Sequence, residues 1–353
     1  MAIEIKHLNH IYGQGTIFEQ YALKDVNLTI HDGEFIGLIG HTGSGKSTLT
    51  QHLNGLLKAT SGDILYNGES IYKEGYSMKE LRSHVGLVFQ YPEHQLFEVD
   101  VFSDVCFGPK NLGLPKEEIE KRAKEALDMV GLDESFYKQS PFDLSGGQKR
   151  RMQLLLILLD EPFSALDTYL KWQLEQEMYK HLKEAGKPVI FVSHNRDEVY
   201  RLCDTVSCMN RGKMEVMEPL KEFFQNPKTR TAAILSGCKN ISAAERVDAH
   251  TLRAVDWGVT LHVKEREIAD DIRAVGIRAH FLATVERPGE ENVFPVNESE
   301  IWEDPFEWNI SFRKNAECSW LQWKIAKTDW SPEMGIPKEL YLKEEDILLL
   351  TDS

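Results

Sequence analysis

The chain has 353 residues, of which 42% are hydrophobic and 27% are charged. These shares are typical of folded soluble proteins and exclude a disordered or fibrous chain. Acidic residues outnumber basic ones by 56 to 41, which gives a net charge of −15. So acidic a chain lacks the positive charge that binding to phosphate backbones requires, and we expect no nucleic-acid partner.

No stretch of the sequence is apolar enough to cross a membrane. The longest apolar run, residues 154–159, is six residues long, whereas a bilayer span needs about 18 to 20. The N-terminus lacks the features of a secretory signal, and the five cysteines form no CxxC pair. We therefore expect a protein of the reducing cytosol, without a structural disulfide or zinc site, that reaches a membrane only through a partner.

The composition changes near residue 235, which predicts two domains, residues 1–235 and 236–353. The first alternates strand-like runs such as 35–39 with helical stretches such as 47–57, which is typical of an α/β layered domain. The second holds six of the seven tryptophans, in short segments of β-branched and aromatic residues separated by turns. This pattern predicts a small β barrel or sandwich.

A glycine-rich loop follows the apolar run FIGLI and precedes the helix-forming run STLTQHL. Residues 40–47 fit the pattern G-x-x-x-x-G-K-[ST], which is typical of a phosphate-binding loop. Its glycines let backbone N–H groups turn toward phosphate oxygens, and the helix N-terminus adds a favourable dipole. Lys46 supplies positive charge to the β- and γ-phosphates, and Ser47 can bind Mg²⁺. The residues expected to contact the nucleotide here are Gly40, Thr42, Gly43, Ser44, Gly45, Lys46, Ser47 and Thr48.

Two later motifs carry polar groups suited to nucleotide chemistry. The sequence LSGGQ at 144–148 could by itself be an ordinary helix N-cap at Ser145. An apolar run ends in Asp160 and Glu161, where Asp160 can hold Mg²⁺ and Glu161 can orient and deprotonate an attacking water. Because adjacent strand residues point to opposite faces, the two carboxylates can serve different tasks. The alternative is a strand that ends in a solvated acidic turn.

Two further polar residues each end a strand-like run. His194 follows PVIFVS, from where it could reach a γ-phosphate, and Gln90 follows VGLVF. A single polar residue after a strand is more often part of the surface, so neither position is specific alone.

Together these motifs resemble the ATP-binding cassette (ABC) family over about residues 1–235. The resemblance implies an α/β P-loop nucleotide-binding domain with a helical insert, followed here by a small β-rich domain similar to OB or TOBE folds. It implies ATP and Mg²⁺ as cofactors and a transmembrane subunit as partner, so that the cassette sits peripherally on the cytoplasmic face of the membrane. It also implies a head-to-tail homo- or heterodimer with a second cassette. Each ATP then lies between the phosphate loop of one chain and the LSGGQ motif, called the signature, of the other chain.

The resemblance implies roles for individual residues. Tyr12 is implied to stack on adenine, with nearby Tyr21 as the alternative, and Gln90 to sense Mg²⁺ and the transmembrane partner. Asp167 is implied to lie in a dimer-contact loop, and His194 to be the switch histidine. The signature residues implied to face the second ATP are Ser145, Gly146, Gly147 and Gln148.

The two parts of the chain resemble different transporters. Residues 1–151, with GHTGSGKSTLTQHLNGLL and VGLVFQYPEHQLFE, resemble the ATPase of an energy-coupling factor importer of vitamins or metal ions. Residues 156–353, with LLDEPFSALDTYLKWQLE and GIRAH, resemble a molybdate importer ATPase with its C-terminal regulatory domain. The groove for the transmembrane subunit is implied to surround Gln90 and the helical insert. We therefore favour an energy-coupling factor partner, with a molybdate importer as the alternative.

The resemblance of the tail raises the possibility of an oxyanion sensor. Lys239, Asn240 and Ser242 are suitable donors near an expected turn. The alternative is a plain solvated loop.

The segment between the signature and the acidic pair is short. Gln148 and Asp160 are twelve positions apart, whereas the family resemblance implies a helix, a loop and a strand, which take about twenty residues. We expect either that the signature is displaced from the dimer interface or that Asp160 and Glu161 lie out of register with the phosphate loop. Either displacement predicts impaired hydrolysis.

Other cassette proteins act in DNA repair, chromosome organisation or translation. These carry long coiled-coil insertions or two cassettes, whereas here only 98 positions separate Lys46 from Leu144, and they contain no heptads. The sequence therefore favours a transport ATPase, and an inactive structural cassette is the third alternative.

Overall fold

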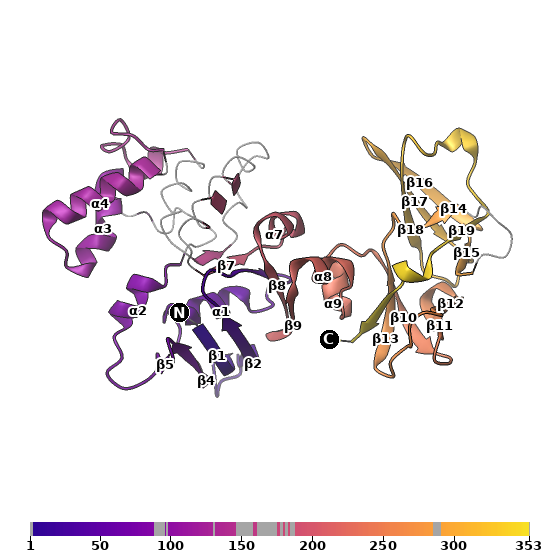
Figure 1. Cartoon of the computed structure of the whole chain (residues 1–353), viewed down its shortest axis with the longest axis horizontal. Helices are drawn as coiled ribbons and strands as arrows, with labels where there is room; N and C mark the ends of the chain where they lie inside the picture. Colours follow the sequence, from indigo (N-terminus) through magenta and orange to yellow (C-terminus); the bar gives the residue numbers. More distant parts are fainter. Residues whose placement is uncertain are drawn as a thin grey trace. The chain divides into compact units, whose positions relative to one another are not determined.

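The computed structural model describes residues 3–87, 96, 98–129, 131–145, 158–160, 175–176, 179–180, 183, 188–284 and 291–352. The chain divides into two units, Met1–Leu220 and Lys221–Ser353 (Figure 1). Several sequence predictions fall outside the described residues, namely those at Gln90, Gly146, Gly147, Gln148, Glu161 and Asp167.

The first unit begins with an antiparallel sheet in the order β2-β1-β4-β5. Long strands with alternating buried and exposed residues form it, as expected for a sheet with one face on a core. Its strands are β1 (Ile3–Tyr12), β2 (Gln20–Ile30), β4 (Ser61–Tyr66) and β5 (Glu69–Ser70).

A second sheet in this unit has the order β6-β7-β3-β8-β9, in which β9 alone runs antiparallel to its neighbour. Strands β3 and β7 are buried along their whole length, which matches their continuous apolar sequence. The strands are β3 (Phe35–Ile39), β6 (Leu158–Asp160), β7 (Val189–Val192), β8 (Thr205–Asn210) and β9 (Lys213–Pro219).

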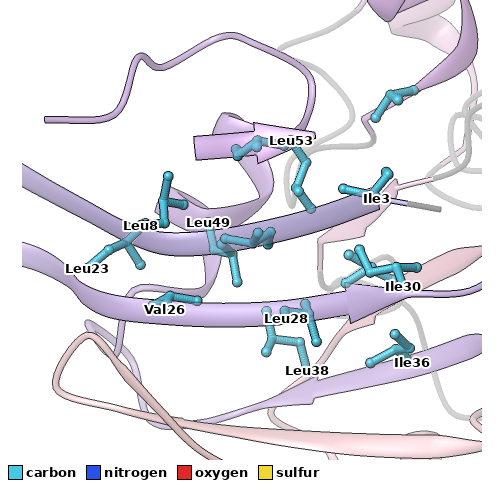
Figure 2. Packing of buried hydrophobic residues seen from close by; sticks show 14 of the residues in the cluster. Ile3, Leu8, Leu23, Val26, Leu28, Ile30, Ile36, Leu38, Leu49 and Leu53 are labelled. Atoms are coloured by element: carbon cyan, nitrogen blue, oxygen red, sulfur yellow. The ribbon is translucent and has the colours of Figure 1, made fainter. Parts of the chain in front are cut away.

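Helix α1 (Lys46–Leu53) shares one core with both sheets. Figure 2 shows Leu49 and Leu53 of α1 in the same cluster as Leu8 of β1, Leu28 of β2 and Leu38 of β3. Burial of large aliphatic side chains such as these contributes about 1.5 to 3 kcal/mol each. This packing fixes the start of α1, and with it the glycine-rich loop, relative to both sheets.

The expected helical insert is present and lies between β5 and β6 in sequence. Helix α2 (Met78–His84) precedes it in sequence. The insert contains α3 (Val101–Leu112) and α4 (Lys116–Met129), which pack together around Cys106, Ile119 and Ala123 (Figure 1). Leu144, directly before the signature serine, is buried with Leu96, Val101, Leu127 and Leu132. The start of the signature is thus anchored on the core of the helical insert.

The second unit is rich in strands, which confirms the prediction from its sequence. Its strands form three antiparallel sheets, of orders β12-β11-β10-β13-β20, β14-β19-β15 and β16-β17-β18, around a core that includes Trp257 and Trp323. The strands are β10 (Asn240–Arg246), β11 (Thr251–Ala254), β12 (Val259–His262), β13 (Ile272–Ile277), β14 (Ala283–Thr284), β15 (Val293–Pro295), β16 (Glu298–Glu303), β17 (Glu307–Arg313), β18 (Leu321–Ala326), β19 (Glu339–Tyr341) and β20 (Leu348–Thr351).

The division between the units lies after Leu220, the first residue of helix α8 (Leu220–Gln225), and before helix α9 (Arg230–Leu235). This is earlier than the boundary expected near residue 235. Ala233 of α9 is buried with residues of β13 and β20. The Thr351 amide donates to the Lys228 carbonyl at 2.9 Å, and the Arg278 guanidinium bonds the Phe224 carbonyl. These contacts bring residues 221–235 into the C-terminal unit.

This packing predicts a difference between two fragments of the C-terminal unit. Residues 221–353 should melt about 5 to 10 °C above residues 236–353, because the shorter fragment loses the Ala233 packing and the hydrogen bonds at Lys228 and Phe224. Tryptophan fluorescence during heating measures both melts. Equal melting temperatures would show that α8 and α9 add nothing to the stability of this unit.

Candidate nucleotide site

The glycine-rich loop joins the end of β3 to the start of α1. Gly43 and Gly45 have φ angles of 79° and 106°, a backbone region that residues with a side chain rarely adopt. A Cβ atom on Gly45 would lie 2.6 Å from the Ala22 carbonyl oxygen, and one on Gly40 would lie 2.4 Å from that of Met209. The loop therefore needs glycine at these positions both for its turn and for its close packing.

Lys46 lies within the curve of this loop. Its ammonium group donates to the carbonyl oxygens of Gly40 at 2.7 Å and His41 at 3.1 Å, and the residue is only 7% exposed. Ser44 is 5% exposed, and its hydroxyl has no hydrogen-bond partner within the described parts of the chain. A buried hydroxyl without a partner is costly, and a phosphate oxygen could satisfy it. The loop thus combines a held cation with an unsatisfied donor, which fits a bound phosphate group.

The remaining predicted loop residues lie at the open side of the loop. Thr42, Gly43 and Ser47 are exposed, and Ser47 and Thr48 belong to the first turn of α1. The N–H groups of Ser47 and Thr48 lie at the N-terminal, positive end of α1, which favours an anion. The exposed Ser47 hydroxyl is available as a ligand for Mg²⁺.

A turn at Gly212, which the sequence did not predict, packs against the phosphate loop. The Gly212 amide donates to the Ser44 carbonyl at 2.9 Å, and the Gly212 carbonyl accepts from the Lys24 amide at 2.8 Å. A Cβ on Gly212 would lie 2.7 Å from the Ala22 carbonyl oxygen, so this position also requires glycine. The only sequence signal is a glycine between two strand-like runs, which predicts a hairpin but not its contact with the loop.

Two other predicted residues, Asp160 and His194, lie at or just after the ends of strands that finish at the same edge of the sheet. Val192 of β7 pairs in parallel register with Leu38 of β3 on one side and with Asp160 of β6 on the other. The Asp160 backbone therefore lies at the edge where the phosphate loop begins, about 10 Å from β3 across one intervening strand. Of the two displacements that the short segment predicts, a shift of Asp160 is not seen in its backbone pairing with Val192. His194, which follows β7, is exposed at this edge.

The structure separates the two tyrosines considered for adenine stacking. The Tyr12 hydroxyl lies 3.4 Å from the Thr48 hydroxyl on the first turn of α1, and the residue is 43% exposed. Tyr21 pairs with Ile11, the neighbour of Tyr12, so it faces the other side of the sheet. Tyr12, and not Tyr21, thus stands on the side of the phosphate loop.

The signature lies partly within the described residues. Ser145 is exposed and follows the buried Leu144. The shortened segment at 149–156 is outside the described residues.

The structure contradicts both alternatives for the tail, an oxyanion site and a plain solvated loop, at two of the three donors. Asn240 and Ser242 lie in strand β10, not in a turn, and both are buried. The Asn240 amide donates to the Gln322 carbonyl at 2.8 Å, and its oxygen accepts from the Gln322 amide at 2.7 Å. The Ser242 hydroxyl accepts from the Asp256 amide and donates to the Ala243 carbonyl. These groups hold strands together, and only Lys239 is exposed.

None of the helices that the structure describes has both the length and the apolar character that a membrane span requires. Within the same described ranges, no group of three or more His, Cys, Asp or Glu side chains is placed to hold a metal ion.

Comparison with known proteins gives consistent relatives for this chain. A family of proteins described as ABC transporter matches residues 23–166. The energy-coupling factor transporter ATP-binding protein EcfA2 of Clostridium perfringens is 47% identical over 238 residues, which cover 65% of this chain and 84% of the relative. EcfA2 of Clostridioides difficile is 40% identical over 281 residues, which cover 77% of this chain and 93% of the relative.

Solved structures agree. The structure of cbiO1 from Clostridium perfringens, part of the ABC transporter complex cbiONQ, has a TM-score of 0.56 and 36% identity over 63% of this chain and 90% of that one. The ATP-binding cassette MJ0796, solved as a dimer bound to ADP and phosphate, has a TM-score of 0.55 and 30% identity over 62% of this chain and 98% of that one.

None of the relatives described above is named for molybdate, so the likeness of residues 156–353 to molybdate importer ATPases stays a prediction. The phosphate loop, the order of the strands around it and the relatives agree on the first unit. The chain belongs to the ABC transporter ATPases, the ATP-binding and ATP-hydrolysing subunits of ABC transporters.

Proposed function

We propose that this chain is the ATPase subunit of an energy-coupling factor importer and that it powers the uptake of a small solute. The loop around Lys46, with the unsatisfied hydroxyl of Ser44 beside it, is the observation that carries the nucleotide role. The importer type rests on the EcfA2 relatives, which are 40 to 47% identical to this chain.

The loop binds the triphosphate in this proposal. Lys46 and the backbone amides of 40–47 neutralise and orient the β- and γ-phosphates, and Tyr12 stacks on the base. Ser47, Asp160 and Gln90 would hold Mg²⁺, which when bound neutralises charge on the phosphates.

Hydrolysis requires a base and an oriented water. Glu161 takes the proton from the attacking water, and His194 contacts the γ-phosphate from the end of the neighbouring strand β7. Ser145, Gly146, Gly147 and Gln148 of a second cassette complete the site, and Asp167 lies in the contact between cassettes.

The partners follow from this role. A transmembrane subunit would dock on the helical insert near Gln90, which holds the chain at the cytoplasmic face of the membrane. A second cassette, identical or related, would form the dimer. The relatives support this, since cbiO1 is described as part of a transporter complex and MJ0796 as a dimer.

Removal of the loop cation should weaken ATP binding. Lys46→Ala should lower the affinity for MgATP by about tenfold to hundredfold, because hydrogen bonds to a charged group are lost where the phosphates bind. Calorimetry on folded protein measures this, with Lys79→Ala as the control, since Lys79 is an exposed lysine of α2. Equal affinities for both variants would exclude Lys46 from the site.

The importer type is tested by co-expression of the full chain with candidate transmembrane subunits from the same genome. We expect the energy-coupling factor subunit to co-purify with the chain and to raise its ATP turnover. Lys46→Ala should co-purify equally well without turnover, which separates docking from catalysis. Co-purification with a molybdate-type subunit instead would contradict the proposed importer type.

A further inference from the structure

Two buried histidines connect strand β1 with helix α1 behind Tyr12. His10 lies two residues before Tyr12 on the strand and is 8% exposed. His52 lies one turn after Thr48 on the helix and is fully buried. The side chains at 10 and 12 share one face of the strand, and those at 48 and 52 share one face of the helix. The two elements therefore face each other through these four residues.

Four contacts join these residues into a closed circuit. The hydroxyls of Tyr12 and Thr48 are 3.4 Å apart, and the rings of Tyr12 and His10 meet edge to face with centroids 4.5 Å apart. His10 Nδ1 lies 3.1 Å from His52 Nε2, and His52 Nδ1 lies 2.7 Å from the Thr48 carbonyl oxygen. The tilt of the Tyr12 ring is thereby tied to the first turns of α1.

The hydrogen bonds that join His10, His52 and Thr48 have a fixed direction. A carbonyl oxygen only accepts, so His52 Nδ1 carries the hydrogen and donates to Thr48. Burial lowers the pKa of His52, so near neutral pH its Nε2 is bare and accepts from His10 Nδ1. The other ring nitrogen of His10, Nε2, is buried and has no hydrogen-bond partner in the described chain. A buried nitrogen without a partner lowers the stability of the fold. The placement of His10 is therefore better explained by its contact with Tyr12 than by stability.

We propose that His10 and His52 are positioning residues that hold the Tyr12 ring ready to stack on the nucleotide base. This inference rests on the proposed stacking role of Tyr12. The histidines connect the base-stacking ring to the helix whose N-terminus binds the phosphates, so one preorganised unit binds both ends of the nucleotide. A side chain that is ordered before binding loses less freedom on binding, which is worth about twofold to tenfold in affinity.

The test compares two probes on the full chain, MgATP and Mg-tripolyphosphate, which has the phosphates but no base. His10→Ala should weaken MgATP binding by about twofold to tenfold and leave tripolyphosphate binding unchanged. In the Tyr12→Ala background, the same change should have no further effect on MgATP, because the two residues act through one contact. His7→Ala is the matched control, an exposed histidine of the same strand that contacts Asp25.

Several results would overturn the proposal. Equal weakening of both probes by His10→Ala would mean that the histidine only supports the fold of α1. An undiminished loss in the Tyr12→Ala background would mean that His10 acts without Tyr12. If His10→Ala does not fold, His52→Gln provides the same comparison with the same expected selectivity. If Tyr12→Ala alone leaves MgATP affinity unchanged, the stacking role itself fails, an outcome distinct from the other two.

Discussion

Replacing Glu161 with glutamine should leave MgATP binding intact and lower ATP turnover by about a hundredfold to ten-thousandfold. The amide keeps the shape of the side chain but cannot take a proton from water. Glu161 follows Asp160, whose backbone lies at the edge of the sheet where the phosphate loop begins. The loss should therefore appear in the chemical step and not in affinity.

Phosphate release and calorimetry on the same preparation separate the two effects. Glu117→Gln, at an exposed position of α4, is the control for the loss of one acidic group. If the ATP turnover of the unaltered chain is too low for a decrease to be measured, the comparison is made in the chain lengthened by the insertion described next. Unchanged turnover in Glu161→Gln would remove this residue from the mechanism.

Lengthening the segment between the signature and β6 should restore hydrolysis. Insertion of an eight-residue helical segment of the family's type after Gln153 should raise turnover by about a hundredfold, since a displacement of about 1 Å at a catalytic group costs that much. It should also raise the melting temperature, because each large buried side chain regained is worth about 2 to 5 kcal/mol.

The strand register sharpens this prediction. The backbone of Asp160 already lies level with Val192 and Leu38. The short segment should therefore lower turnover through the position of the signature at the second cassette more than through the strand that ends at Asp160. An insertion of eight glycines and serines is the control, since it adds length without a helix. If the unaltered chain hydrolyses ATP at an ordinary cassette rate and melts no lower than the lengthened one, the short segment does no harm.

The phosphate loop could be predicted from the sequence because its determinants are local. An apolar strand, glycines with positive φ at 43 and 45, and a helix that begins at Lys46 all lie within about twenty residues. The β-rich nature of the tail could also be predicted, because alternation and β-branched residues are read within each strand.

Features that depend on distant partners could not be predicted. Asn240 resembles a ligand donor in sequence, yet its amide pairs with Gln322, which is 82 positions away. Residues 221–235 belong to the C-terminal unit through contacts with residues far along the chain, such as those of Lys228 with Thr351 and of Phe224 with Arg278. His10 and His52 are 42 positions apart, and neither shows in sequence that it contacts the other.

Titration of the full, folded chain with ATP in the presence of Mg²⁺ tests the assignment of residues 40–47 most directly. Calorimetry should show saturable binding of one ATP per chain, and the same titration of Lys46→Ala should show a loss of about tenfold to hundredfold in affinity. No saturable binding to the folded chain, or the same affinity with and without the Lys46 ammonium, would contradict a nucleotide site at this loop.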